Sequence, residues 1–253
     1  MNSVTEEFLP LSYSGLKAFR VSPKIFLQYK TQDRDSASMR VGRATHSRWL
    51  TPERWDTEFT VYEGKRDKRM QAYQDVLKEY SEDQVLNPKE FQTISECVAA
   101  LESDAMASDL LAQAPTREQH IHMEIAGLPV HGFVDASGPG LLLDLKTTRL
   151  PPHSAAQADK ELRFSGHHRQ LAMYREGLLQ EHPGRSLTAW VVWVRNAPPY
   201  DIWIHRITDE DLAYGLEWVN DTLELYKQWD GRPVDARWRL DLPFTESSLC
   251  GSK

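Results

Sequence analysis

The sequence predicts one α/β domain in which helices flank a central mixed sheet of about five strands. Three observations support this fold class. Apolar residues recur with helical spacing before residue 116, their spacing then changes to that of strands, and strands and helices alternate to residue 230. The chain contains no internal repeat or linker. We therefore expect a single domain with a helical part (1–115), an α/β core (116–230) and an irregular tail (231–253).

Helices are expected where apolar residues recur every three or four positions, and these segments are 11–30, 36–50, 88–113, 155–181 and Thr208–Trp229. Ser12 or Ser14 can cap the first helix, which is interrupted at Pro23, a residue that suits the first turn of a second short helix. Thr208 is the expected cap of the last helix. The highly charged segment 63–69 is expected to be a loop or an exposed helix start.

Strands are expected where apolar runs are short or alternate with polar residues, and these segments are 120–125, 129–136, 141–147, 187–195 and 200–207. The tetrapeptide Ser137–Gly140 (SGPG) is a strong turn signal, so the strands on either side of it form an antiparallel hairpin. Asn196–Pro199 is the expected turn between the last two strands.

The composition is that of a compact globular protein and excludes several classes. The 253 residues include only two cysteines, 13 glycines and 14 prolines, which rules out collagen-like, disordered and disulfide-stapled chains. Two cysteines cannot supply a four-thiolate iron–sulfur or zinc site. The longest apolar runs, Val98–Leu101 and Ala189–Val194, are far shorter than the roughly 20 residues that span a bilayer. No signal peptide is visible at the N-terminus, and we expect a cytoplasmic protein.

The net charge of −7 argues against a nucleic-acid partner, but the charges are unevenly distributed. Residues 11–79 contain 14 Lys and Arg against 9 Asp and Glu, a net charge of +5. Residues 201–230 contain 2 against 8, a net charge of −6. This asymmetry predicts a polarised surface on which the acidic C-terminal helix faces away from a polyanionic substrate.

Two aspartates and a lysine converge at the predicted hairpin. Asp144 and Lys146 project from one face of their strand, because side chains two residues apart share a face. Asp135 ends the preceding strand and is brought beside them by the turn. Carboxylate oxygens suit Mg²⁺ or Mn²⁺, and a neighbouring lysine can orient or activate water. The alternative is an exposed ion pair, but charges inside the apolar run LLLDLKTT favour a functional site.

The following helix adds a second pair of polar residues. Gln170 and Tyr174 are four positions apart and so share a helical face. By itself this pair is typical of a surface glutamine beside a core tyrosine. Beside the hairpin, an amide and a hydroxyl on one face indicate contacts with a phosphate, a base edge or a water molecule.

The order D-x8-D-x-K followed by Q-x-x-x-Y resembles the PD-(D/E)xK nucleases of the RecB-like branch, and in particular the exodeoxyribonuclease VIII (RecE)-like nuclease domains and phage recombination exonucleases. The resemblance extends over LSYSGLKAFRVSPKIF, VGRATH, LPVHGFVDA, LLLDLKTT and HRQLAMY. Two departures are that Val134 replaces the proline before Asp135, and that an aspartate, Asp144, fills the position of the variable acid.

The resemblance implies a site for one or two Mg²⁺ ions, for which Mn²⁺ can substitute, without an iron–sulfur cluster. The implied metal ligands are His46, Asp135, Asp144 and the Leu145 carbonyl, with Glu124 as a further acidic candidate. The implied catalytic residues are Asp135, Asp144, Lys146, Gln170 and Tyr174.

The resemblance also implies an exonuclease that degrades linear double-stranded DNA from its ends, 5′ to 3′, and leaves 3′ single-stranded tails for an annealing recombinase. Such enzymes tend to form homo-oligomeric rings, so a trimer or tetramer in a bacterial or phage-infected cell is expected, with no membrane partner. One alternative is an endonuclease or flap nuclease in repair or phage defence. Another is a non-catalytic DNA-binding or assembly protein, against which the intact set of site residues argues.

Candidate DNA contacts are basic residues and one histidine, namely Arg43, Lys65, Arg66, Lys68, Arg69, Arg163, His168 and Arg169. The run at 65–69 is as typical of a solvated face as of a DNA grip. His120 and His122 are interpreted as strand surface rather than a two-histidine metal site. Trp49 and Trp55 are expected in the core, with an aromatic wedge at a point of strand separation as the alternative.

Overall fold

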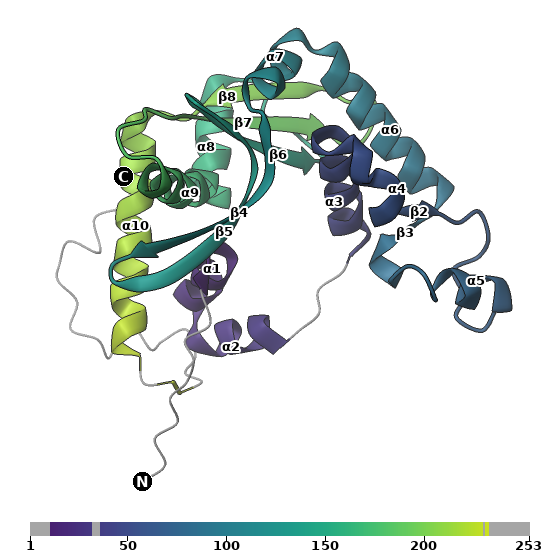
Figure 1. The fold of residues 1–253 in the computed structure, drawn as a ribbon, viewed down its shortest axis with the longest axis horizontal. Helices are drawn as coiled ribbons and strands as arrows, with labels where there is room; N and C mark the ends of the chain where they lie inside the picture. The colour runs from purple at the N-terminus through teal and green to yellow at the C-terminus, as the bar shows by residue number, and fades with distance from the viewer. Residues whose placement is uncertain (1–10, 32–35, 230, 233–253) are drawn as a thin grey trace.

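A six-stranded sheet with helices on both faces forms the centre of the structure (Figure 1). The structure is a computed structural model that describes residues 11–31, 36–229 and 231–232. The strand order is β1-β5-β6-β7-β8, and β4 also pairs with β5. Strands β6 and β7 are parallel, whereas β4–β5, β5–β6 and β7–β8 are antiparallel. The mixed sheet flanked by helices confirms the predicted fold class.

The sheet strands are β1 (Leu11–Ser12), β4 (Thr116–Ile125), β5 (Leu128–Gly138), β6 (Leu141–Thr148), β7 (Thr188–Arg195) and β8 (Ile202–Arg206). A separate two-stranded sheet consists of β2 (Thr60–Val61) and β3 (Val85–Leu86). The helices are α1 (Tyr13–Val21), α2 (Pro23–Thr31), α3 (Ala37–Leu50), α4 (Trp55–Glu58), α5 (Gln71–Val76), α6 (Pro88–Ser103), α7 (Ala105–Gln113), α8 (Ala155–Ser165), α9 (His167–Glu181) and α10 (Asp209–Gln228).

Side-chain caps fix where several helices begin. The Ser12 hydroxyl accepts a hydrogen bond from the Gly15 amide at 3.2 Å, so Ser12 rather than Ser14 caps the first helix. Thr208 caps α10 as predicted, by accepting from the Asp211 amide at 3.1 Å. In each case the hydroxyl satisfies a backbone amide that has no partner within the helix.

Two predicted helices are each divided into two. The segment 88–113 breaks at Asp104, whose carboxylate accepts from the Ala107 amide at 2.8 Å and so starts α7. The segment 155–181 breaks at Gly166, which has a left-handed backbone with φ of 79°. The Tyr13 hydroxyl donates to the Gly166 carbonyl at 2.8 Å, and a Cβ at Gly166 would lie 2.2 Å from that hydroxyl. Glycine therefore allows both the turn and the close contact.

The hairpin of β4 and β5 is longer than the sequence predicts. It closes through a two-residue turn in which Ala126 and Gly127 have φ of 52° and 71°, the left-handed pair of a tight hairpin turn. Pairing then continues from Ile125–Leu128 back to Thr116–Ser137. The first strand of the core therefore begins at Thr116, four residues before the predicted start.

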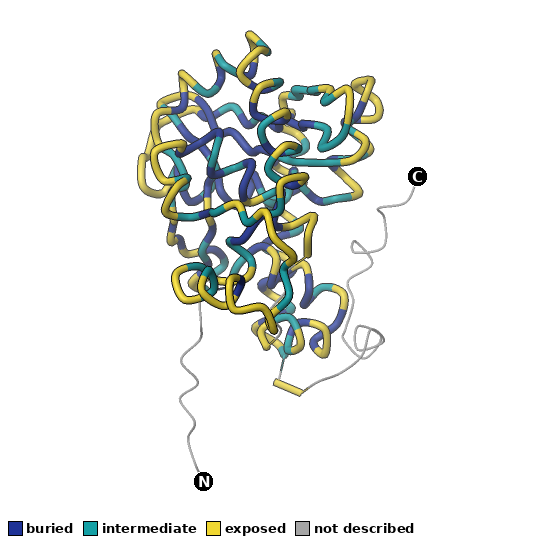
Figure 2. Tube along the Cα trace, turned by 90° about the vertical axis from the view of Figure 1, so that its right-hand side faces the viewer, coloured by how far each residue is buried: buried dark blue, intermediate teal, exposed yellow. Residues whose placement is uncertain are grey.

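The buried stretches of the chain gather in the interior of the molecule, and exposed stretches surround them (Figure 2). Two apolar cores lie on opposite sides of the sheet. One contains residues of β4, β5 and β7 packed against α1, α2, α9 and α10, with Leu16, Phe19 and Trp193 among its buried side chains. The other contains residues of β6 and β7 packed against α3, α6 and α7. Trp49 is 4% exposed in this second core, so the interpretation of Trp49 as a core residue is confirmed and a role as a wedge is excluded.

Among the described residues, no helix is both long and apolar enough to cross a membrane. Cys97 is buried, and burial raises the pKa of its thiol to about 12, which leaves it unreactive at neutral pH. Most of the predicted irregular tail, residues 233–253, lies outside the described residues.

Candidate active site

Asp135 lies where β5 separates from β6. The two strands pair only beside their turn, over Ala136–Gly138 and Leu141–Leu143. Beyond that point the Asp135 carboxylate replaces the missing strand partner, because its Oδ2 accepts a hydrogen bond from the Leu145 amide at 2.7 Å. This bond fixes the carboxylate at the opening between the two strands.

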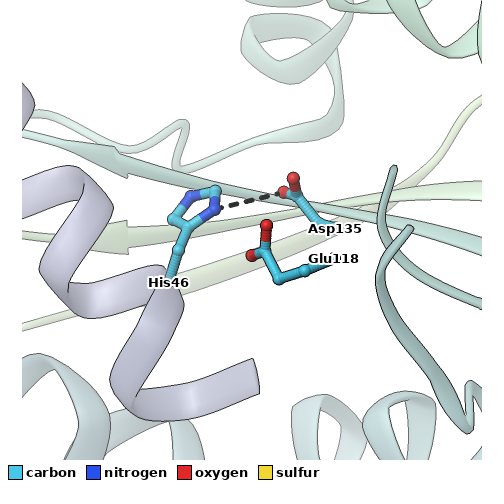
Figure 3. Close-up of side chains that lie close together, drawn as sticks. All are labelled: His46, Glu118 and Asp135. Carbon is cyan, nitrogen blue, oxygen red and sulfur yellow. Dashed lines mark ion pairs between the residues drawn. The ribbon is translucent and has the colours of Figure 1, made fainter. Parts of the chain in front are cut away.

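His46 approaches Asp135 from helix α3, and its Nδ1 lies 3.6 Å from the Asp135 Oδ2 (Figure 3). The helix comes this close to β6 partly through Gly42, where a Cβ would lie only 3.1 Å from the Thr147 hydroxyl. His46 follows Gly42 by one helical turn and so lies on the same face. The G-x-x-x-H spacing thus places the imidazole over the sheet.

Glu118 completes a three-residue cluster that the sequence interpretation missed. Ligand atoms of His46, Glu118 and Asp135 all lie within 4.8 Å of one another (Figure 3). Glu118 and Asp135 lie at opposite positions between the register pairs Arg117–Ala136 and Gln119–Val134, and Glu118 has a positive φ of 46°. Burial and the negative charges of Asp135 and Glu58 raise the pKa of Glu118 to about 7. Carboxylates that are held close together despite burial and mutual repulsion are typical of a cation site.

Asp144 and Lys146 form a buried ion pair beside this cluster. Lys146 Nζ lies 2.7 Å from Asp144 Oδ1, and the two side chains are 23% and 2% exposed. The Asp144 Oδ2 is buried without a hydrogen bond in the described part of the chain. Such an unsatisfied carboxylate oxygen is costly unless a cation or proton meets it.

The surroundings of this pair shift the pKa of both side chains. Burial raises the pKa of Asp144 to about 6, because the charge of Lys146 compensates only partly for lost water. Burial opposes the charge of Lys146, but the Asp144 and Asp135 carboxylates outweigh it and raise the pKa of Lys146 above its usual range. Lys146 therefore stays protonated at neutral pH.

Helix α9 contributes the predicted polar pair. Gln170 Nε2 donates to the Tyr174 hydroxyl at 3.0 Å. Burial raises the pKa of Tyr174, with opposing effects from the Gln170 hydrogen bond and the nearby Lys146 charge. The Tyr174 ring lies directly against Gly132 of β5, where a Cβ would be 2.2 Å from a ring carbon. Glycine in the LPVHGFVDA segment thus seats the tyrosine beside the hairpin.

Two further residues near Lys146 were not assigned to the site from the sequence. Burial and the charges of Lys146 and Lys17 lower the pKa of His167 to about 2, so its imidazole is neutral. Burial raises the pKa of Tyr13 to about 12. The motif SYSGLKAF thus supplies a buried Tyr13 that lies close enough to Lys146 for the lysine charge to act on it. The signal that could have found His167 is its place one helical turn before Gln170.

Two predicted site residues lie elsewhere. Glu124 is exposed at the far end of β4, opposite Pro129, and its amide donates to Gln180 at 3.2 Å. The acidic residue that β4 brings to the cluster is Glu118, so the expectation for Glu124 is wrong. His168 is fully buried, with its Nδ1 2.8 Å from the Leu162 carbonyl and its ring stacked on Tyr214. It packs between helices and cannot contact DNA.

The basic run at 65–69 is largely neutralised by acidic neighbours. Arg66 lies 3.1 Å from Glu90 and donates to the Val85 carbonyl at 2.8 Å, so it ties the loop to the body of the protein. The other pairs are Lys65 with Asp67 at 3.9 Å, Lys68 with Glu82 at 2.6 Å and Arg69 with Asp67 at 2.6 Å. Arg66 is therefore a structural residue, while DNA contacts by the other three stay predictions.

The remaining candidate DNA contacts occupy different surroundings. Arg43 lies beside the His46 cluster and pairs with Asp83 at 2.9 Å. Arg163 is 3.5 Å from Asp211, and Arg169 lies over the Trp218 ring of α10 at 4.7 Å. Arg43 lines a polar pocket of about 480 Å³ that also includes His46 and Glu118. Arg43 is thus the predicted basic residue that shares a pocket with the cluster.

The ligand types in the cluster define its chemistry. Carboxylate oxygens with one imidazole nitrogen suit a hard or borderline divalent cation such as Mg²⁺ or Mn²⁺. A protonated lysine beside it suits an anionic substrate. Helix α9 lies between this site and helix α10 (Figure 1), so it separates the acidic residues of α10 from the site. The arrangement is that of a site for a phosphate ester.

The split hairpin with Asp135, Asp144 and Lys146 defines the α/β core of PD-(D/E)xK-type proteins. The chain belongs to the family described as PDDEXK-like domain of unknown function (DUF3799), whose model matches residues 12–233. Among solved structures, it is similar to a crystal structure from Eubacterium rectale of a protein provisionally named an exonuclease, with a TM-score of 0.65 and 17% identity over 100% of both chains. A search of curated proteins finds no match. The family expected from the sequence is confirmed, and the structural likeness confirms the fold.

Proposed function

We propose that this protein is a Mg²⁺-dependent deoxyribonuclease that degrades linear double-stranded DNA from its ends. The observation that carries the proposal is the buried Asp144–Lys146 pair beside the cluster of His46, Glu118 and Asp135. An ion pair alone could be structural. An ion pair with an unsatisfied carboxylate oxygen, next to three converging ligands in a PDDEXK-like core, favours phosphodiester hydrolysis.

The residues fit a divalent cation. His46, Glu118 and Asp135 would hold it, with the unsatisfied Asp144 Oδ2 and the Leu145 carbonyl as further ligands. When bound, the cation would polarise the phosphate and lower the pKa of a coordinated water. Burial and the neighbouring carboxylates disfavour the charged form of Glu118 and raise its pKa to about 7. A bound cation would offset this repulsion between the carboxylates.

Lys146 is the residue that would meet the reacting phosphate. Because its pKa is raised, Lys146 keeps its proton and cannot serve as a general base at neutral pH. It donates hydrogen bonds instead, either to the attacking water or to the phosphate oxygens on which negative charge develops. The structure thus favours the orienting and charge-stabilising role over direct activation of water.

The wall formed by α9 would position the DNA strand near the cut. Gln170 donates a hydrogen bond to Tyr174, and Tyr174 lies close enough to Lys146 for the lysine charge to lower its pKa against the larger effect of burial. The neutral His167 can donate or accept one hydrogen bond without adding charge. Together they hold a phosphate or a sugar by polar contacts rather than by Coulomb attraction.

Exonuclease action, 5′-to-3′ polarity, a homo-oligomeric ring and an annealing recombinase partner are further parts of the proposal. All four are supported by the resemblance of the sequence to RecE-like nucleases, and exonuclease action alone is also supported by the name of the E. rectale protein. A ring around DNA would also fit the net charge of −7, because enclosure then supplies part of the grip that bulk charge does not.

The test is digestion of matched linear and circular duplexes, the linear one labelled at either its 5′ or its 3′ end, in Mg²⁺ and in EDTA. We expect early release of the 5′ label in Mg²⁺ alone and no cleavage of the circle. Cleavage of the circle would instead indicate an endonuclease. DNA binding without any Mg²⁺-dependent cleavage would indicate a non-catalytic protein, and either result would overturn the proposal.

A further inference from the structure

Four aromatic side chains gather on the exposed face of the β4–β5 hairpin. His120 lies directly opposite Phe133, and His122 lies opposite His131. The His120 and Phe133 rings are parallel, with centroids 4.3 Å apart and an interplanar angle of 6°. His120 Nε2 and His131 Nδ1 are 3.0 Å apart. We call these four residues the hairpin aromatic patch.

The patch is exposed although its rings are ordered by mutual contact. Phe133 is 54% exposed, while its strand neighbours Gly132 and Val134 are buried on the opposite face of β5. Exposing half of a phenylalanine in the middle of a long strand forgoes the stabilisation that burial would give. Unlike the isolated Phe164, Phe133 is held in place by a neighbouring ring, so it presents an ordered aromatic face to a partner.

The patch is continuous with the candidate active site. Phe133 and Asp135 lie two residues apart on the same face of β5 and are therefore about 7 Å apart along the strand. That spacing is close to the distance between successive phosphates of an extended nucleic-acid strand. A strand with one phosphate at Asp135 thus has its next base within reach of the Phe133 ring.

On the side away from Asp135, the patch leads into a groove. A cavity of about 420 Å³ lies between the three histidines of the patch and the helices α1 and α2. Its lining includes Tyr29 and the exposed Lys30, whose ammonium group lies 4.8 Å over the Phe26 ring. The groove thus combines aromatic rings with a cation at its edge, which is the pairing that binds bases and backbone of single strands.

We propose that the hairpin aromatic patch is a stacking platform for unpaired nucleobases, and that it holds a single-stranded DNA end beside the active site. This inference rests on the proposed function for its substrate class. The base would stack on the exposed face of the Phe133 ring, and the parallel His120 ring contacts the other face of Phe133. Stacking of this kind tolerates any sequence, because every base has a π-face.

A transition-metal site is the other use of clustered histidines, and the geometry disfavours it. The His122 and His131 ring centroids are 6.3 Å apart, and a hydrogen bond joins His120 Nε2 and His131 Nδ1. Within the described residues, the group of three ligands that converges is the His46 cluster. A metal also leaves the exposed Phe133 ring unexplained.

The test measures binding of a short fluorescent oligodeoxythymidylate, and quenching of a 2-aminopurine base in the same strand, in EDTA so that cleavage is suppressed. We expect Phe133→Leu to weaken binding by about 5- to 150-fold and to abolish the quenching, because leucine keeps the apolar character but cannot stack. Phe133→Trp should bind at least as well as the wild type. Phe164→Ala is the matched control, since Phe164 is 87% exposed on α8, and it should change nothing.

Each other outcome has a defined meaning. Equal binding by the wild type and Phe133→Leu overturns the platform, as does equal weakening by Phe164→Ala. Binding that is absent in EDTA and appears only with added Ni²⁺ overturns it in favour of a metal site. A wild type that binds and quenches as expected but cleaves nothing in Mg²⁺ refutes the proposed nuclease activity and leaves the platform standing. Thermal unfolding of each variant checks that it is folded.

Discussion

Metal binding at the His46 cluster should strengthen as the pH rises, because Glu118 must lose a proton before its carboxylate can serve as a ligand. Burial and the charges of Asp135 and Glu58 raise the pKa of Glu118 to about 7. With this pKa, about a quarter of the Glu118 groups are ionised near pH 6.5 and about nine tenths near pH 8. The affinity for Mn²⁺ should therefore rise about fourfold over this range. Asp144, with a pKa of about 6, adds little because it is mostly ionised throughout.

Calorimetric titration with Mn²⁺ measures this directly. Near pH 7, titrations in two buffers of different ionisation enthalpy should reveal release of about half a proton per bound ion from Glu118. Glu118→Gln removes one titrating ligand and should weaken both the pH dependence and the proton release. Glu58→Gln removes one charge that raises the pKa of Glu118, so it should shift the rise in affinity to lower pH. An unchanged pH dependence in Glu118→Gln would refute the assignment of Glu118 to the site.

Three further substitutions test other parts of the structure. Lys146→Ala should reduce cleavage by about 10²- to 10⁴-fold while the circular dichroism spectrum is retained, and near wild-type rates would show that Lys146 is not catalytic. Gly132→Ala forces a Cβ to within 2.2 Å of the Tyr174 ring, whereas the Cβ of Gly140→Ala meets nothing within 4 Å. Gly132→Ala should therefore lower Tm by about 2–12 °C, and Gly140→Ala should have little effect. Equal Tm values for the two variants would contradict the contact between Gly132 and Tyr174. Arg66→Ala removes a partner of the buried Glu90 and should cost about 1–3 kcal/mol in the free energy of unfolding. Lys65→Ala, at an exposed position, should stay within about 0.5 kcal/mol, and urea denaturation that shows equal losses would contradict the structural role of Arg66.

The parts of the site that the sequence predicts depend on short-range patterns. Asp144 and Lys146 share a strand face by alternation, and Gln170 and Tyr174 share a helical face by spacing. The SGPG turn then brings Asp135 beside them. These relations need no knowledge of the tertiary structure, which is why they could be predicted from the printed sequence.

Glu118 was missed because its position depends on the register of a longer hairpin. The turn at Ala126–Gly127 carries weak signals, since alanine seldom adopts a positive φ. Once that turn is known, counting outward from the pair Ile125–Leu128 places Glu118 at the position opposite Asp135. Glu124 was predicted instead from the family resemblance, as an acidic residue on the strand before the hairpin of Asp135 and Asp144.

The basic and histidine residues show a second limit. Whether a charged side chain faces solvent depends on partners that are remote in sequence, such as Glu90 for Arg66. His168 is buried by packing against α10, which lies more than 40 residues away along the chain. Local composition indicates a polar surface in both cases, and only the tertiary structure shows that both residues are structural.

The central claim, that the His46–Glu118–Asp135 cluster and the Asp144–Lys146 pair form a metal-dependent nuclease site, is tested most directly by one comparison. Release of nucleotides from linear duplex DNA is measured in Mg²⁺ for the wild type and for Asp135→Asn, which keeps the side-chain shape but removes the charge. We predict cleavage by the wild type that EDTA abolishes, and a loss of about 100-fold or more in Asp135→Asn. Cleavage by the wild type in EDTA, or near wild-type cleavage by a folded Asp135→Asn variant, would contradict the claim.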